Sequence, residues 1–126
     1  MFKALLILPC AAFFAWLASM AFVYPRGLLR GFGIEVEGLD GMNEIRAVYG
    51  GFPLIMSLGL LLSLWRAELR VAAPVAVALA MVGMAIGRVV SAAVDQGAGK
   101  LPVTFLIIEL AIAGALGAAA MLARRA

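Results

Sequence analysis

Four long apolar runs dominate the chain, and charged residues fall mainly between them. Two of these runs contain no charge, and each of the other two is interrupted by a single charge, Arg88 or Glu109. Each run approaches or exceeds the roughly 20 residues that an α-helix needs to cross about 30 Å of hydrocarbon. The pattern therefore predicts four transmembrane helices. Their predicted bounds are about 4–24, 46–65, 71–94 and 102–122.

The composition is typical of an integral membrane protein. Of the 126 residues, 66% are hydrophobic and 13% are charged, against roughly 45–50% and 25% in soluble domains. The four predicted spans take up nearly the whole chain, which leaves no soluble domain for conventional catalysis. We therefore predict an all-α fold, an integral membrane four-helix bundle that forms one domain over residues 1–126 within a lipid bilayer.

The only substantial loop is predicted at residues 25–45, where five glycines favour turns over helix. Within it, residues 34–37 alternate apolar and acidic side chains, as a short strand would. Its other apolar residues suggest a flap on the membrane surface, and a plain connector is an equally good interpretation. These apolar residues are Leu28, Leu29, Phe32 and Leu39.

Length, proline position and a short charged turn add detail to the first three predicted spans. The first span begins like a signal peptide, but it is longer than the roughly 7–15 apolar residues of such a segment, so we expect it to be retained. Pro53 lies about two turns into the second span and frees a backbone carbonyl near Tyr49, which predicts a kink there. The short charged turn at residues 66–70 makes the second and third spans antiparallel neighbours.

The basic residues lie mostly at the ends of the predicted helices and do not form a cluster. This distribution indicates a topology signal, and it argues against nucleic acid binding. Because basic residues are enriched on the cytoplasmic side, their narrow excess on one side predicts that both termini lie in the cytoplasm. That side carries Lys3, Arg66, Arg70, Arg124 and Arg125, and the opposite side carries Arg26, Arg30, Arg46 and Lys100.

The sequence contains few residues that could bind a metal or a cofactor. The chain has no histidine, and its one cysteine, Cys10, lies inside the first span. A haem, zinc or iron–sulfur site of the usual ligation cannot be assembled from these residues. We therefore predict no metal, no cofactor and no catalytic residues.

Polar residues gather where the second span begins and recur deep in the last two spans. Arg88 lies about 10 Å before Asp95 along its helix, and Glu109 lies about 10 Å beyond Pro102. Arg88 and Glu109 should therefore share one depth, and intramembrane charges usually pair or line a polar cavity. We predict that they pair. Helical spacing also puts one set of third-span residues on a single face, namely Val77, Met81, Met84, Arg88, Ser91 and Asp95.

These residues define a candidate polar cluster. We give equal weight to two roles for this cluster. It could link the helices structurally, or it could be a ligand or proton site, since an intramembrane ionisable group is a functional hypothesis by default. A pocket that opens toward the loop side, with Tyr49 and Met84 in its wall, would favour the ligand. The candidate cluster comprises Asn43, Glu44, Arg46, Tyr49, Arg88, Ser91, Asp95 and Glu109.

Small residues predict close helix packing. Gly83 and Gly87 form a GxxxG pattern in the third span, and residues 113–118 keep the fourth span thin. Packing within the chain explains this pattern at least as well as dimerisation does.

Three features of the sequence together match the pattern of a known family. They are the polar stretch at residues 43–51, the pair Gly87-Arg88 followed by Ser91 and Asp95, and a glutamate in the last span. The sequence resembles the bacterial four-helix inner-membrane proteins of domain of unknown function family 4345, over nearly the whole chain. The resemblance implies a tetraspan fold and no established activity. It also implies that eight positions are marked in the family: Asn43, Glu44, Arg46, Tyr49, Gly50, Gly51, Arg88 and Ser91.

Three functional hypotheses follow. The first is a non-enzymatic accessory subunit or scaffold of a larger membrane complex, favoured by the small size and the glycine- and alanine-rich helix faces. The second is a binder or carrier of a small anionic or amphiphilic molecule, held by Arg46 and Arg88. An intramembrane enzyme is the least supported, because no nucleophile with a base and no metal constellation can be named.

Overall fold

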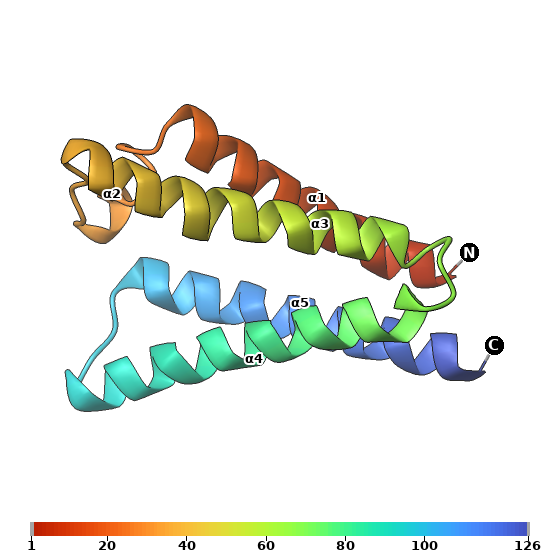
Figure 1. The fold of residues 1–126 in the computed structure, drawn as a ribbon. Coiled ribbons are helices and arrows are strands. Elements are labelled where there is room, and N and C mark those ends of the chain that lie inside the picture. Colours follow the sequence, from red (N-terminus) through yellow and green to blue (C-terminus); the bar gives the residue numbers. More distant parts are fainter. Residues whose placement is uncertain (1, 126) are drawn as a thin grey trace.

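Four long helical segments run antiparallel, and the two ends of the chain lie at the same end of the bundle (Figure 1). In this computed structural model, which describes residues 2–125, each segment is long and apolar enough to cross a membrane. The predicted all-helical class, a four-helix membrane bundle, is confirmed. The helices are α1 (Phe2–Val23), α2 (Gly38–Ile45), α3 (Phe52–Leu62), α4 (Leu69–Val94) and α5 (Lys100–Arg125).

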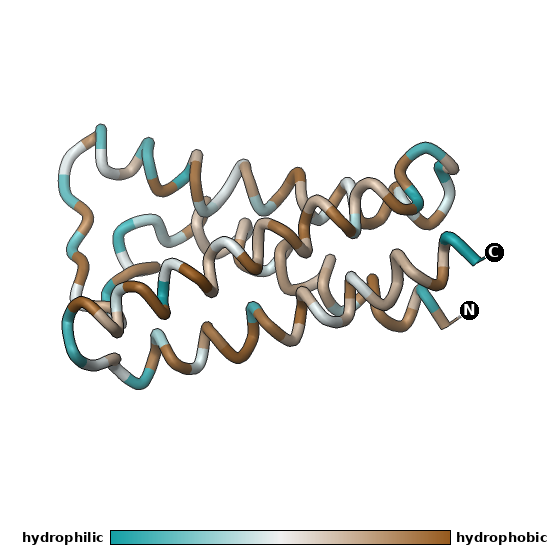
Figure 2. Tube along the Cα trace, turned by 90° about the horizontal axis from the view of Figure 1, so that it is seen from below, coloured by the Kyte–Doolittle hydropathy of each residue, from teal (hydrophilic) through white to brown (hydrophobic). Residues whose placement is uncertain are grey.

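Hydrophobic and hydrophilic residues are distributed differently along the bundle. Apolar residues run along the helices, and hydrophilic residues concentrate at the two ends of the bundle (Figure 2). We call the end that carries the first and last helical residues the terminal end, and the opposite end the loop end. This distribution suits a bilayer, because uncharged side chains face the hydrocarbon and charged ones reach the two aqueous borders.

The main core lies toward the terminal end and draws on α1, α3, α4 and α5. Ser57 of α3 donates a hydrogen bond of 2.9 Å from its hydroxyl to the carbonyl oxygen of Ala11 in α1, in fully buried surroundings. Small side chains let these helices approach closely, as is usual in membranes. The buried members of this core are Ile7, Cys10, Ala11, Phe14, Met56, Leu60, Val77, Met81, Ile112, Leu116 and Ala119.

The bundle consists of two helix pairs, α1 with α3 and α4 with α5. Helices α3 and α4 contact each other near the short turn that joins them. This contact confirms that the second and third spans are antiparallel neighbours. Toward the loop end the two pairs separate (Figure 1). A second, smaller core fills part of this end, where Ala21, Leu29 and Ile45 are buried.

The loop between the first two spans is shorter than the sequence predicts. Residues 38–45 form α2, where the sequence predicts a loop, because the buried side chain of Ile45 anchors this helix in the second core. The predicted strand at residues 34–37 is wrong. No strand partners it in the described part of the chain, and Val36 instead packs close to Gly41, where an added Cβ would lie 3.1 Å from the Val36 side chain.

A π-helical turn at Arg46–Gly51 joins α2 to α3 without a break in the helix. The backbone N–H of Phe52 bonds to the carbonyl of Ala47, five residues earlier, where an α-helix would reach back four. Pro53 follows directly and lacks an N–H, so the α-helical bonding pattern cannot be completed there. The sequence predicts a kink at this position, and the structure has a widened turn.

The ring of Phe22 packs against this turn at Gly50. An added Cβ on Gly50 would lie 3.0–3.2 Å from three ring atoms of Phe22, whereas Gly51 next to it has room. Glycine at position 50 therefore allows α1 to approach the turn closely.

Candidate functional site

Arg88 of α4 and Glu109 of α5 form a paired charge inside the helical region. The Arg88 Nε lies 2.9 Å from each carboxylate oxygen of Glu109, and Nη2 lies 2.7 Å from Oε1. The side chain of Glu109 is 4% exposed and that of Arg88 is 22% exposed. The predicted pairing is confirmed. Antiparallel packing of α4 on α5 brings the two residues to the same depth, as the spacing from the connecting turn requires.

Aromatic rings link this pair to the loop end. The guanidinium carbon of Arg88 lies 5.4 Å from the centroid of the Phe105 ring, within the range of a cation–π contact. Phe105 lies one turn before Glu109, and its ring centroid is 5.4 Å from that of Phe32 in the loop. Phe32, Phe105, Arg88 and Glu109 therefore form one continuous contact between the loop, α5 and α4.

The Arg88 guanidinium keeps unused donors. Glu109 takes the Nε–H and one N–H of Nη2, whereas a guanidinium carries five donors. Nη1 makes no hydrogen bond with a described residue and is not among the buried atoms that lack a partner, so it is accessible. Arg88 can therefore bind a further acceptor without leaving Glu109.

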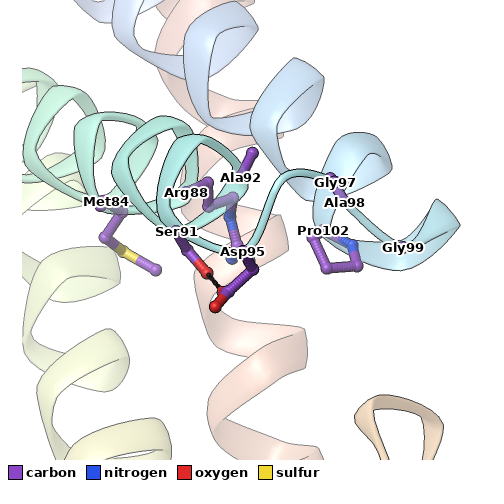
Figure 3. Close-up of a pocket in the computed structure, with 10 residues that line it drawn as sticks. Met84, Arg88, Ser91, Ala92, Asp95, Gly97, Ala98, Gly99 and Pro102 are labelled. Atoms are coloured by element: carbon purple, nitrogen blue, oxygen red, sulfur yellow. Dashed lines mark hydrogen bonds between the residues drawn. The ribbon is translucent and has the colours of Figure 1, made fainter.

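A pocket of about 480 Å³ lies beside Arg88 at the loop end of α4 (Figure 3). Within it, the Ser91 hydroxyl donates to Oδ2 of Asp95 over 3.0 Å. The pocket combines a cation, a hydroxyl and a carboxylate with apolar and glycine surfaces. Its lining residues are Met84, Gly87, Arg88, Ser91, Ala92, Asp95, Gly97, Ala98, Gly99 and Pro102.

The eight residues of the candidate polar cluster do not gather in one place. Asn43, Glu44 and Arg46 are exposed on α2 and the π-helical turn, and they make no side-chain hydrogen bond or ion pair with any residue from 2 to 125. The reason is that α2 and the π-helical turn pack on α1 and α3, away from α4. The pocket thus receives only Arg88, Ser91 and Asp95 directly, with Glu109 behind Arg88.

The two residues expected in the pocket wall also separate. Met84 lines the pocket, whereas Tyr49 is half-buried against the second core. Residues 43–51 therefore shape the helix and its packing on Phe22, and the pocket chemistry comes from α4 and the connector that follows it.

Sequence reasoning missed Phe105 and the connector at residues 97–99. Phe105 could have been found by its spacing, because a residue four positions before Glu109 shares its helix face. Two glycines within four residues after Asp95, Gly97 and Gly99, signal a narrow connector that leaves space beside the helix end. No comparable signal indicates that α2 turns away from α4.

The GxxxG pattern of α4 is not used within the chain. An added Cβ on Gly83 or Gly87 would meet nothing within 4 Å, and both residues are exposed. The prediction that this pattern supports packing inside the bundle is therefore wrong for these two glycines. Helix α4 turns a different strip inward, with Val77, Met81 and Ala85 buried.

Comparison with known proteins gives one match. The sequence model of the family described as Domain of unknown function (DUF4345) matches residues 1–120. The chain belongs to this family. No curated protein and no solved structure matches it. Membership in DUF4345 confirms the family inferred from the polar stretch and the Gly87-Arg88 segment, and it brings no activity with it.

Proposed function

We propose that this protein binds an amphiphilic membrane molecule, in a non-enzymatic role, at the pocket beside Arg88. The observation that carries the proposal is Arg88, which lines a pocket of about 480 Å³ and keeps donors that Glu109 does not use. Small-molecule sites are mostly apolar cavities of about 300–1,000 Å³ with a few polar groups that fix orientation. The pocket has a volume in that range, and it is an open groove, because most of its lining residues are exposed.

The depth of the pocket supports an amphiphile. Met84 and Gly87 lie toward the middle of α4, whereas Asp95 is at the end of the helix, about 16 Å beyond Met84 at 1.5 Å per residue. A molecule with a polar head and an apolar chain can therefore meet polar groups at the helix end and apolar groups deeper in the bilayer.

A purely structural pair would explain the site less well. Glu109 alone satisfies one edge of the guanidinium, and buried ion pairs are weak support for stability. Arg88 also lines the pocket, where a ligand oxygen would satisfy donors that Glu109 does not use. This placement shifts the balance between structural link and ligand site toward the ligand.

A role as an accessory subunit of a larger membrane complex is the second proposal. Its support is the exposed Gly83 and Gly87 face of α4, which no residue from 2 to 125 covers. Small residues at this spacing typically mark contacts between membrane helices. A helix of another membrane protein could approach the α4 backbone there.

We further propose the inner membrane of a bacterium as the location, with both termini in the cytoplasm. The support is the excess of basic residues at the terminal end, which also carries the turn between α3 and α4.

Gentle-detergent purification followed by native mass spectrometry tests both functional proposals. Gly87→Leu places a bulky side chain in the pocket, and Gly83→Leu is the matched control on the same face outside the pocket lining. A bound amphiphile that is lost in Gly87→Leu and kept in Gly83→Leu would support binding at the pocket. A protein partner lost in both variants would support the subunit. A wild-type protein that retains neither would overturn both proposals.

A further inference from the structure

The charged groups of the pocket lie in a fixed order along α4. Arg88 is the deepest, Ser91 follows one turn later, and Asp95 is the first residue after the helix. Seven residues separate Arg88 from Asp95, which is about 10 Å along the axis. A cationic group thus lies deep in the pocket and a carboxylate lies at its mouth.

The charge balance of the site disfavours a purely anionic ligand. The guanidinium of Arg88 is already neutralised by Glu109 at 2.7 Å. Asp95 accepts a hydrogen bond only from Ser91 and forms no ion pair with a described residue. Since Glu109 already neutralises Arg88, Asp95 is the unpaired charge among the lining residues, at the mouth of the pocket. Lys100, outside the lining, directly follows Gly99.

Building on the proposed function, we infer that the pocket selects a zwitterionic phospholipid with a primary amine headgroup. Its phosphate would accept from the free N–H groups of Arg88, and its ammonium would donate to Asp95. In such a lipid the phosphate adjoins the glycerol and the ammonium forms the tip. The lipid therefore presents its anion deep and its cation at the surface, which complements the order along α4.

Hydrogen bonding favours a primary amine over a trimethylated one. An ammonium group carries three donors, and Oδ1 of Asp95 has no hydrogen bond from a described residue. A trimethylammonium group has no N–H and can offer Asp95 only its charge. Gly97 and Gly99 in the pocket lining leave room for the small amine at the mouth.

The test uses the full chain purified in a mild detergent. It is incubated in mixed micelles with equimolar phosphatidylethanolamine, phosphatidylcholine and phosphatidylglycerol, and bound lipid is counted by native mass spectrometry. We expect phosphatidylethanolamine to be retained about two- to fivefold more than either other lipid, as a single partly exposed charge contact allows. Asp95→Asn should remove this preference. The matched control Glu35→Gln, an exposed acid at the same end of the bundle, should leave it unchanged.

The outcomes separate the inference from the proposed function. Equal retention of the three lipids, preference for phosphatidylglycerol, or a preference that survives Asp95→Asn would overturn the inference. If bound lipid still falls in Gly87→Leu in those cases, binding at the pocket stands without headgroup selection. Absence of any retained lipid would overturn binding at the pocket, and with it the inference.

Discussion

Arg88 reaches across the interface of α4 and α5 and places its Nε 2.9 Å from both carboxylate oxygens of Glu109. Glu109 is almost fully buried, whereas part of the guanidinium remains accessible at the pocket. The pair therefore has an inner member that needs a partner for stability and an outer member that can interact with something else. The first two predictions separate these two roles.

Removal of one member should destabilise the protein strongly. Glu109→Ala leaves the Arg88 charge without its partner between two helices, and we expect a loss of about 3–5 kcal/mol in the free energy of unfolding. The measurement is denaturation of the detergent-solubilised protein by heat or by sodium dodecyl sulfate.

The double variant Arg88→Met with Glu109→Leu should be within about 1 kcal/mol of wild type, because apolar replacement of a buried pair is often neutral. It should also lose the lipid retained by the wild-type protein. A double variant as unstable as the single one would show that the pair itself stabilises the bundle.

Two neighbouring glycines should respond differently to alanine. Gly50→Ala must displace the Phe22 ring by a few tenths of an ångström, and we expect a cost of about 1 kcal/mol. Gly51→Ala has ordinary contact distances and should gain up to about 1 kcal/mol through helix propensity. Thermal unfolding of both variants gives the comparison. In a Phe22→Ala background the cost of Gly50→Ala should vanish, and a persistent cost would contradict the role assigned to Phe22.

The π-helical turn should tolerate the loss of one residue. A turn that bonds five residues back holds one residue more than an α-helical turn. Deletion of Ala47, which is exposed in this turn, should therefore let α2 and α3 connect through a turn with one residue fewer, with both buried faces kept in register. Deletion of Leu58, equally exposed but inside α3, would rotate the helix by about 100° and remove Ser57 or Leu60 from the core. Folded yield by size-exclusion chromatography should be retained only for the first deletion.

The loop should depend on its aromatic contact for order. Phe32→Ala removes the ring that packs on Phe105, and we expect trypsin to cleave after the exposed Arg30 several-fold faster than in wild type. Cleavage after Arg66, in the turn at the opposite end, is the internal control and should not change. Equal acceleration at both sites would indicate global destabilisation.

The proposed orientation predicts a labelling pattern in intact cells. A membrane-impermeant maleimide should modify Glu35→Cys, at the loop end, and should leave Ala67→Cys, at the terminal end, unmodified. The native Cys10 is 5% exposed in the main core and should stay unlabelled in both variants. The reverse pattern would place the termini outside the cytoplasm.

The sequence predicts the number of helices and the central ion pair because both depend on one-dimensional spacing. Charge-free runs define the spans, and equal distances from the α4–α5 connector put Arg88 and Glu109 at one depth. Side-chain periodicity also places Met84, Ser91 and Asp95 near Arg88. These inferences need only the geometry of single helices and one short turn.

The remaining features depend on which helices face each other, and a single sequence encodes this poorly. The sequence predicts Arg46 and Tyr49 in the same cluster as Ser91, but the π-helical turn that carries them packs on α1, where Phe22 meets Gly50. The glycines of the loop predict turns, whereas burial of Ile45 favours a helix there. In both cases tertiary packing overrides the local preference.

The two helix pairs are packed most fully at the terminal end, and they separate at the loop end. Lateral movement of α4 and α5 away from α2 therefore requires no helix to unfold, but it must break the contact between Phe32 and Phe105. Amide hydrogen exchange should accordingly be slowest around Phe14 and Leu60 and fastest in α2. Motions of this kind occur in microseconds to milliseconds, and they leave the pocket intact, because its lining comes only from α4 and residues 95–102.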